Sequence, residues 1–134
     1  MAAAGTAAAQ VPIQPSSAEA SEIAGEMYVA YTNGGVAQML AVEQGCWAEV
    51  AKDEVPNKGI AALCVTTGLS GAFIESAIAR RQGRGAHPDF QGAAVRDRAL
   101  NLSGLSEEDA EEVIAAAVEN QDAILGGLVA AGMR

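Results

Sequence analysis

One segment, residues 59–82, repeats its large apolar side chains at helical spacing around nearly the whole helix circumference. These side chains form two opposite stripes, with Ile60, Leu63, Ile74 and Ile78 in one and Val65, Leu69 and Phe73 in the other. A helix that is apolar on all sides is buried on all sides, so we expect this segment to be the central helix. Its length suits a bilayer, which needs about 20 mainly apolar residues. Glu75, several hydroxyl side chains and the lack of an aromatic belt argue against a membrane span.

The residues before this segment predict a helix that forms a hairpin with it. Residues 16–19 have the capping-box pattern, which starts a first helix. Residues 33–35 contain two consecutive glycines, which end or kink that helix because glycine destabilises a helix interior. A second helix is predicted over residues 36–53. Residues 55–59 contain a proline and a glycine and predict a tight turn into the central helix.

The residues after the central helix predict a loop and two further helices. Residues 83–91 have loop composition, and a short helix is predicted over residues 93–100. Ser106 caps one final helix, whose acidic first turn suits the helix dipole. No strand-like alternation occurs in the sequence. We therefore predict an all-α fold, a small bundle of three to five helices with a central helical hairpin. Residues 1–15 are predicted to be a flexible arm and residues 16–134 a single helical domain.

The sequence contains few large apolar side chains. Thirty residues are alanine and 15 are glycine, whereas Leu, Ile, Val and Phe together number 28. Burial of each large apolar side chain stabilises a fold by roughly 1.5–3 kcal/mol, so a monomer of this composition has a small margin of stability. Close helix packing through alanine and glycine, or burial of one face against another subunit, would increase that margin. We expect both.

The net charge of −9 opposes nonspecific binding to nucleic acid or to an anionic membrane, and no nucleic-acid partner is predicted. The charges are unevenly distributed. Residues 80–98 hold five of the eight basic residues, and residues 107–122 hold seven acidic residues and no basic one. This segregation favours contact between copies of the chain, although a solvated loop beside a solvated helix explains it as well. The residues predicted to form such an interface are Leu69, Phe73, Arg80, Arg81, Arg84, Glu108 and Glu112.

Two carboxylates, Glu43 and Glu75, are predicted to lie among apolar residues of the hairpin. With a turn near Asn57, their levels differ by four residues, about 6 Å along the helices. Such a pair could hold a metal or share a proton. Alternatively, each carboxylate hydrogen-bonds to a tyrosine or an arginine, or is exposed. The single histidine, His87, is predicted to be solvated in a loop, so the Glu-x-x-His pairs of dinuclear bundles are absent. We predict no metal site and no cofactor.

The two cysteines are too few for a disulfide framework or a cysteine-only zinc site. With the turn near Asn57, Cys46 and Cys64 are offset by about one helical turn, so an intrachain disulfide would require a register shift, and we expect free buried thiols. Ser70 lacks the pattern of a nucleophile elbow. The first residues lack the charged and apolar regions of a signal peptide, which indicates a bacterial cytoplasmic location.

These observations leave three hypotheses for function. The first is a non-enzymatic helical subunit that assembles with copies of itself or within a larger complex. The second is an acidic binding module, an adaptor or inhibitor that docks a basic protein through the final helix. The third is a small enzyme or ligand binder that uses the core carboxylates, which the absence of any catalytic pattern disfavours.

Overall fold

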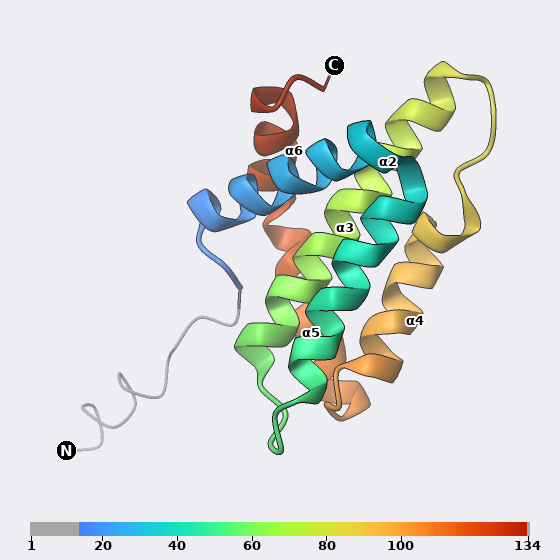
Figure 1. Ribbon diagram of the computed structural model, residues 1–134. Helices are drawn as coiled ribbons and strands as arrows, with labels where there is room; N and C mark the ends of the chain where they lie inside the picture. The colour runs from blue at the N-terminus through green and yellow to red at the C-terminus, as the bar shows by residue number, and fades with distance from the viewer. Residues whose placement is uncertain (1–13, 134) are drawn as a thin grey trace.

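The computed structural model describes residues 14–133, which contain five α-helices, one short 3-10 helix and no β-strand. The elements are α2 (Ser17–Ala51), α3 (Lys58–Arg81), η1 (Pro88–Phe90), α4 (Gly92–Leu102), α5 (Glu107–Glu119) and α6 (Gln121–Ala130). The predicted all-α fold is confirmed, and α2 and α3 form its central hairpin (Figure 1).

The first two predicted helices form one helix, α2, with a kink at Gly35. Gly35 has φ 69° and ψ −154°, a backbone conformation that residues other than glycine rarely adopt. Figure 1 shows the first part of α2 crossing the bundle and the second part running alongside α3. The kink therefore lets one helix pack against two partners, α6 through its first part and α3 through its second.

Helix α3 is the central element, because within residues 14–133 only this helix contacts every other element. The expectation that it is buried on all sides is wrong. Its buried face carries mainly small or polar residues, including Ala61, Cys64, Thr66, Gly68 and Ser70. Leu63, Leu69 and Phe73 are only half-buried. The small residues let neighbouring helices approach closely, and the hydroxyls of Thr66, Thr67 and Ser70 donate to backbone carbonyls four residues earlier.

The single final helix predicted after Ser106 is instead two helices, α5 and α6, which are bent by 51° at Asn120. The Ser106 cap itself is confirmed, since its side chain accepts a hydrogen bond from the Asp109 backbone N–H. The bend directs α6 across the first part of α2. At the crossing, a Cβ at Gly127 would overlap the Ser21 backbone, so only glycine allows this close approach.

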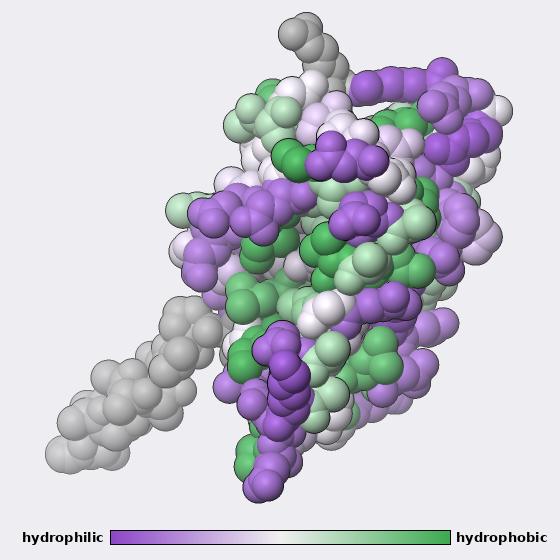
Figure 2. Space-filling model, in the orientation of Figure 1, coloured by the Kyte–Doolittle hydropathy of each residue, from purple (hydrophilic) through white to green (hydrophobic). Residues whose placement is uncertain are grey.

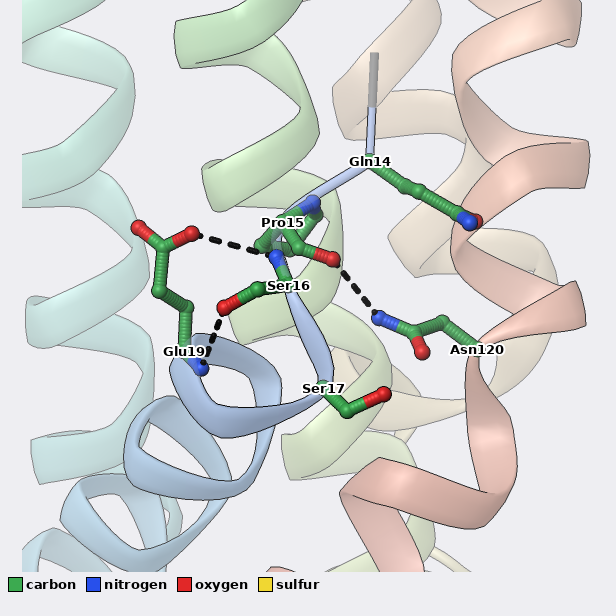
Figure 3. A pocket seen from close by; sticks show the side chains of 6 residues that line it. All are labelled: Gln14, Pro15, Ser16, Ser17, Glu19 and Asn120. Carbon is green, nitrogen blue, oxygen red and sulfur yellow. Dashed lines mark hydrogen bonds between the residues drawn. The ribbon is translucent and has the colours of Figure 1, made fainter. Parts of the chain in front are cut away.

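The start of α2 is held by a reciprocal cap (Figure 3). The Ser16 hydroxyl accepts from the Glu19 N–H, and the Glu19 carboxylate accepts from the Ser16 N–H, as the capping-box pattern predicts. Pro15 is buried, and its carbonyl accepts a hydrogen bond from Asn120 at the bend. Of the predicted arm, residues 1–13 lie outside the described residues, and Pro15 belongs to the folded domain.

Candidate functional site

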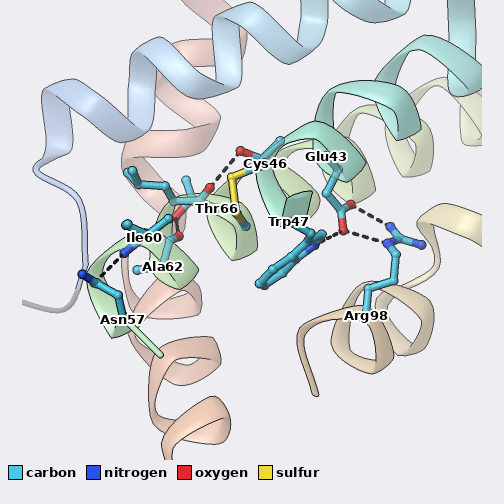
Figure 4. The surroundings of a disulfide bond; sticks show 11 residues. Glu43, Cys46, Trp47, Asn57, Ile60, Ala62, Thr66 and Arg98 are labelled. Carbon is cyan, nitrogen blue, oxygen red and sulfur yellow. Dashed lines mark hydrogen bonds and ion pairs between the residues drawn. A yellow bond between two sulfur atoms is a disulfide. The ribbon is translucent and has the colours of Figure 1, made fainter. Parts of the chain in front are cut away.

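Glu43 of α2 is fully buried and forms an ion pair with Arg98 of α4 (Figure 4). Arg98 donates from Nε and Nη2 to the two carboxylate oxygens, both at 2.7 Å. Trp47 donates its indole N–H to Glu43 Oε2 at 2.9 Å. The guanidinium also lies over the Phe90 ring, 5.1 Å from its centroid. Every charge at this site is therefore paired, and the geometry is that of a bidentate arginine–carboxylate pair.

Glu75 of α3 is also fully buried and is held by Arg84, from the loop that follows its own helix. Arg84 donates from both terminal nitrogens, at 2.6 and 3.1 Å, and the His87 backbone N–H donates at 2.6 Å. Arg84 holds the pKa of Glu75 below its usual value, because it stabilises the ionised carboxylate against the opposing effect of burial. This carboxylate fixes the course of the 82–87 loop.

The two carboxylates do not share a site. Cys46 and Cys64 pair across the hairpin, and each is nine residues from Val55, so the turn is centred two residues before the predicted position. In this register Glu43 and Glu75 differ by about eight residues, roughly 12 Å along the helices. No group of metal-ligating side chains occurs among residues 14–133. The hypothesis that each carboxylate hydrogen-bonds to an arginine is confirmed.

Cys46 and Cys64 form a disulfide between α2 and α3, with their Cα atoms 5.5 Å apart. The expectation of free buried thiols is therefore wrong, and the shifted turn is the reason. Cys64 is fully buried, whereas Cys46 is half-buried and lies in a shallow surface groove with Glu19, Glu22 and Glu26. The disulfide joins the hairpin one helical turn from Glu43.

The other residues considered for catalysis have structural roles. His87 is exposed, as predicted, and its Nδ1 accepts a hydrogen bond from the Asp89 backbone N–H at the start of η1. Ser70 is buried, and its hydroxyl donates to the Thr66 carbonyl. The Asp89 carboxylate lies 3.8 Å from His87 Nδ1, but both side chains are exposed to solvent, and the Ser70 hydroxyl is hydrogen-bonded to the backbone of its own helix.

Leu69 and Phe73, two of the predicted interface residues, line a surface groove along α3. One end, about 220 Å³, is almost wholly apolar and is lined by Val65, Leu69, Gly92, Val95, Arg96, Ile114 and Val118. The other end, about 390 Å³, is lined by Leu69, Ala72, Phe73, Ser76, Ala86, Phe90, Gln91 and Gly92. Leu69 and Gly92 line both hollows, so the two adjoin each other along α3, and together we call them the groove. Val118 is 46% exposed, which makes the groove an accessible apolar surface.

The charged residues predicted to form an interface divide into two groups. Arg84 and Glu112 are bound within the chain, to Glu75 and Lys58 respectively, and so are not free to pair with another copy. Arg80, Arg81 and Glu108 are exposed, and no ion pair within residues 14–133 involves them. Arg96, from the same basic segment, pairs with Glu111 across the edge of the groove.

No protein-family model, curated protein or solved structure matches the chain. In the described part of the chain, α3 is long and apolar enough to cross a membrane, but 61% of its most apolar window is buried inside the molecule. The bent pair α5 and α6 passes the same test of length and composition only if taken as one span. On the face shown in Figure 2, hydrophobic residues form separate patches between hydrophilic ones.

Proposed function

We propose that this chain is a non-enzymatic helical subunit that associates with a second copy of itself through the groove along α3. The observation that carries this proposal is the mainly apolar groove along α3, in which the large side chains of Leu69 and Phe73 are only half-buried. The buried face of α3 is already packed within the chain, so Leu69 and Phe73 gain further burial only by contact with another surface. Leu69 and Phe73 are also two of the interface residues predicted from the sequence.

A second copy is supported by the charges beside the groove. Arg80 lies on the same helical face as Leu69 and Phe73, because the spacings of 11 and 7 residues are whole numbers of turns. Glu107 lies on the same face of α5 as Ile114 and Val118 for the same reason. The groove therefore carries a positive charge beyond one end and a negative charge beyond the other, which one chain can match with another copy of itself.

The other two hypotheses gain no support. Three of the acidic residues of α5 are engaged by basic residues of the same chain, Asp109 and Glu112 by Lys58 and Glu111 by Arg96. This leaves less free negative charge for a basic partner. Both core carboxylates are occupied by arginines, which suits a structural role. The disulfide supports an oxidising compartment rather than the predicted cytoplasm, because reducing cytosol keeps such thiols unpaired.

The proposal is tested by light scattering over a concentration series with two matched valine variants. The wild-type mass should rise from 13.5 kDa toward twice that value as concentration increases. Val118→Glu places a charge in the groove and should keep the protein monomeric. Val129→Glu is the control, because Val129 is a 68% exposed helical valine on α6, outside the groove. Leu69→Glu is a second groove variant. A wild-type monomer at every concentration, or an unchanged mass in both groove variants, would show that the proposal is wrong.

A further inference from the structure

The acidic first turn of α5 and the basic end of α3 lie at similar distances from Leu69, in the middle of the groove. Lys58, at the start of α3, contacts Asp109 and Glu112, so α3 and α5 begin at the same level. Further along both helices, Leu69 of α3 lines a hollow with Val118 of α5, so the two helices run in the same direction. Leu69, which lines both parts of the groove, is 11 residues from Lys58 and 11 residues from Arg80. Each interval is about 16 Å of helix. The acidic first turn of α5 and the basic end of α3 therefore flank Leu69 almost evenly.

A surface with this polarity is complementary to itself when one copy is turned end to end. A two-fold axis near Leu69 places the Leu69 side chains of both copies together and sets the basic end of each α3 over the acidic first turn of the other copy's α5. An interface of this kind is isologous and closes after two copies. The parallel arrangement would instead place Arg80 against Arg80 and the acidic turns against each other, which like-charge repulsion disfavours.

We infer that the association is a two-fold dimer in which Arg80 and Arg81 of each copy face Glu107 and Glu108 of the other; this inference rests on the proposed function. These are the residues left for such a contact once pairing within the chain is removed. Arg84 is bound to Glu75, Arg96 to Glu111, and Lys58 holds Asp109 and Glu112. The four remaining side chains are exposed and take part in none of the ion pairs among residues 14–133.

Two charge-reversal variants test the inference. One carries Arg80→Glu with Arg81→Glu, and the other carries Glu107→Lys with Glu108→Lys. Each alone should weaken homodimerisation at low ionic strength by roughly tenfold, because exposed pairs are individually weak and four are reversed in each dimer. Salt should reduce the wild-type affinity in the same direction. Circular dichroism checks that each variant keeps its helices, and Lys52→Glu is the control, since Lys52 is exposed and outside the groove.

Mixing the two variants distinguishes the inference from the broader proposal. In the two-fold arrangement, a mixed dimer pairs opposite charges at both ends, so a 1:1 mixture should recover the wild-type affinity and form mainly mixed dimers. Unchanged homodimers of both variants, or a mixture no tighter than its components, would overturn the two-fold arrangement while the groove variants still report on self-association. If the variant with both arginines reversed binds the wild type more tightly than the wild type binds itself, the copies are parallel, and the end-to-end two-fold arrangement is wrong. A wild-type monomer would overturn both.

Discussion

Glu43 and Glu75 are buried to the same degree, yet the surroundings that hold them differ. Glu43 is held by residues of two helices, Arg98 from α4 and Trp47 from α2. Glu75 is held by the loop after α3, through Arg84 and the His87 N–H. The Arg98 side chain is 16% exposed and the Arg84 side chain 39% exposed. The Glu43–Arg98 pair is thus enclosed within the helical bundle, whereas the Glu75–Arg84 pair holds a loop against the end of the bundle.

This difference indicates where each pair contributes. An enclosed ion pair costs desolvation for both groups, so its net contribution is small, but removal of one partner leaves an uncompensated charge. When the partner lies on a loop, its removal costs less, because the loop can move and let water solvate the carboxylate. We therefore expect the Glu43 pair to define how α4 docks on the hairpin, and the Glu75 pair to define the path of the loop.

The largest expected effect is that of Arg98→Met, which removes the partner of Glu43. The free energy of unfolding should fall by about 3–5 kcal/mol, because a buried carboxylate is left without its counter-charge. Urea denaturation followed by far-UV circular dichroism measures the change. Trp47 is the only tryptophan and donates to Glu43, so its fluorescence should respond in the same variant before unfolding begins.

A second substitution separates the stranded charge from lost packing. Glu43→Gln in the Arg98→Met background removes the charge and keeps an oxygen that accepts from Trp47. Most of the lost stability should return. If the double variant is as unstable as Arg98→Met, the loss comes from the packing of the Arg98 side chain over Phe90 and not from the unpaired charge of Glu43.

Reduction of the Cys46–Cys64 disulfide should lower the free energy of unfolding by an intermediate amount, and it acts on the part of the hairpin that carries Glu43. Cys46 and Cys64 are 18 residues apart, and closure of a loop of this length corresponds to about 3 kcal/mol in the chain-entropy description. Thiol titration in denaturant should find no free thiol before reduction. The melting temperature should fall after reduction, whereas Cys46→Ser with Cys64→Ser should melt at the same temperature with and without reductant. Two free thiols in freshly purified protein would contradict the disulfide.

The parts of this fold that could be predicted from the sequence are those set by neighbouring residues. The Ser16 and Ser106 caps, the break at Gly35 and the turn before α3 each follow from a short motif whose chemistry acts within about one helical turn. The bend at Asn120 follows no such motif. It depends on α6 packing across α2 at Gly127, which joins residues about a hundred positions apart.

The residues of the candidate site were predicted in type but not in pairing. The helical pattern placed Glu43 and Glu75 in the hairpin core correctly, and both are buried. Arg98 is 55 residues from Glu43, and no local signal selects it from the other arginines. The hairpin turn was placed two residues too late, and this small error changed the cysteines from a disulfide pair to an offset pair. Register depends on how two helices pack, which the periodicity of each helix alone does not specify.

The smallest expected effect is at Glu75, and it should depend on pH. The pKa of this carboxyl is lowered in the folded protein, mainly by Arg84, so the pair stabilises the fold above the ordinary carboxyl pKa of about 4.3 and loses that contribution as the pH falls through the lower folded value. In Arg84→Met, the buried Glu75 carboxylate keeps only the His87 N–H, and we expect a cost of about 1–3 kcal/mol at pH 7.

The difference in unfolding free energy between the wild type and Arg84→Met should therefore shrink as the pH falls below the ordinary carboxyl pKa and through the lower folded value, because Glu75 then becomes protonated in the wild type as well and needs no arginine. Urea denaturation at several values between pH 3 and pH 7 measures this difference. Arg96→Met is the matched control, because it removes the partner of Glu111, which lies at the surface where solvent weakens the pair. A difference that stays constant with pH would show that Arg84 acts through loop packing. A cost at pH 7 equal to that of Arg98→Met would show that the loop encloses Glu75 as tightly as the helices enclose Glu43.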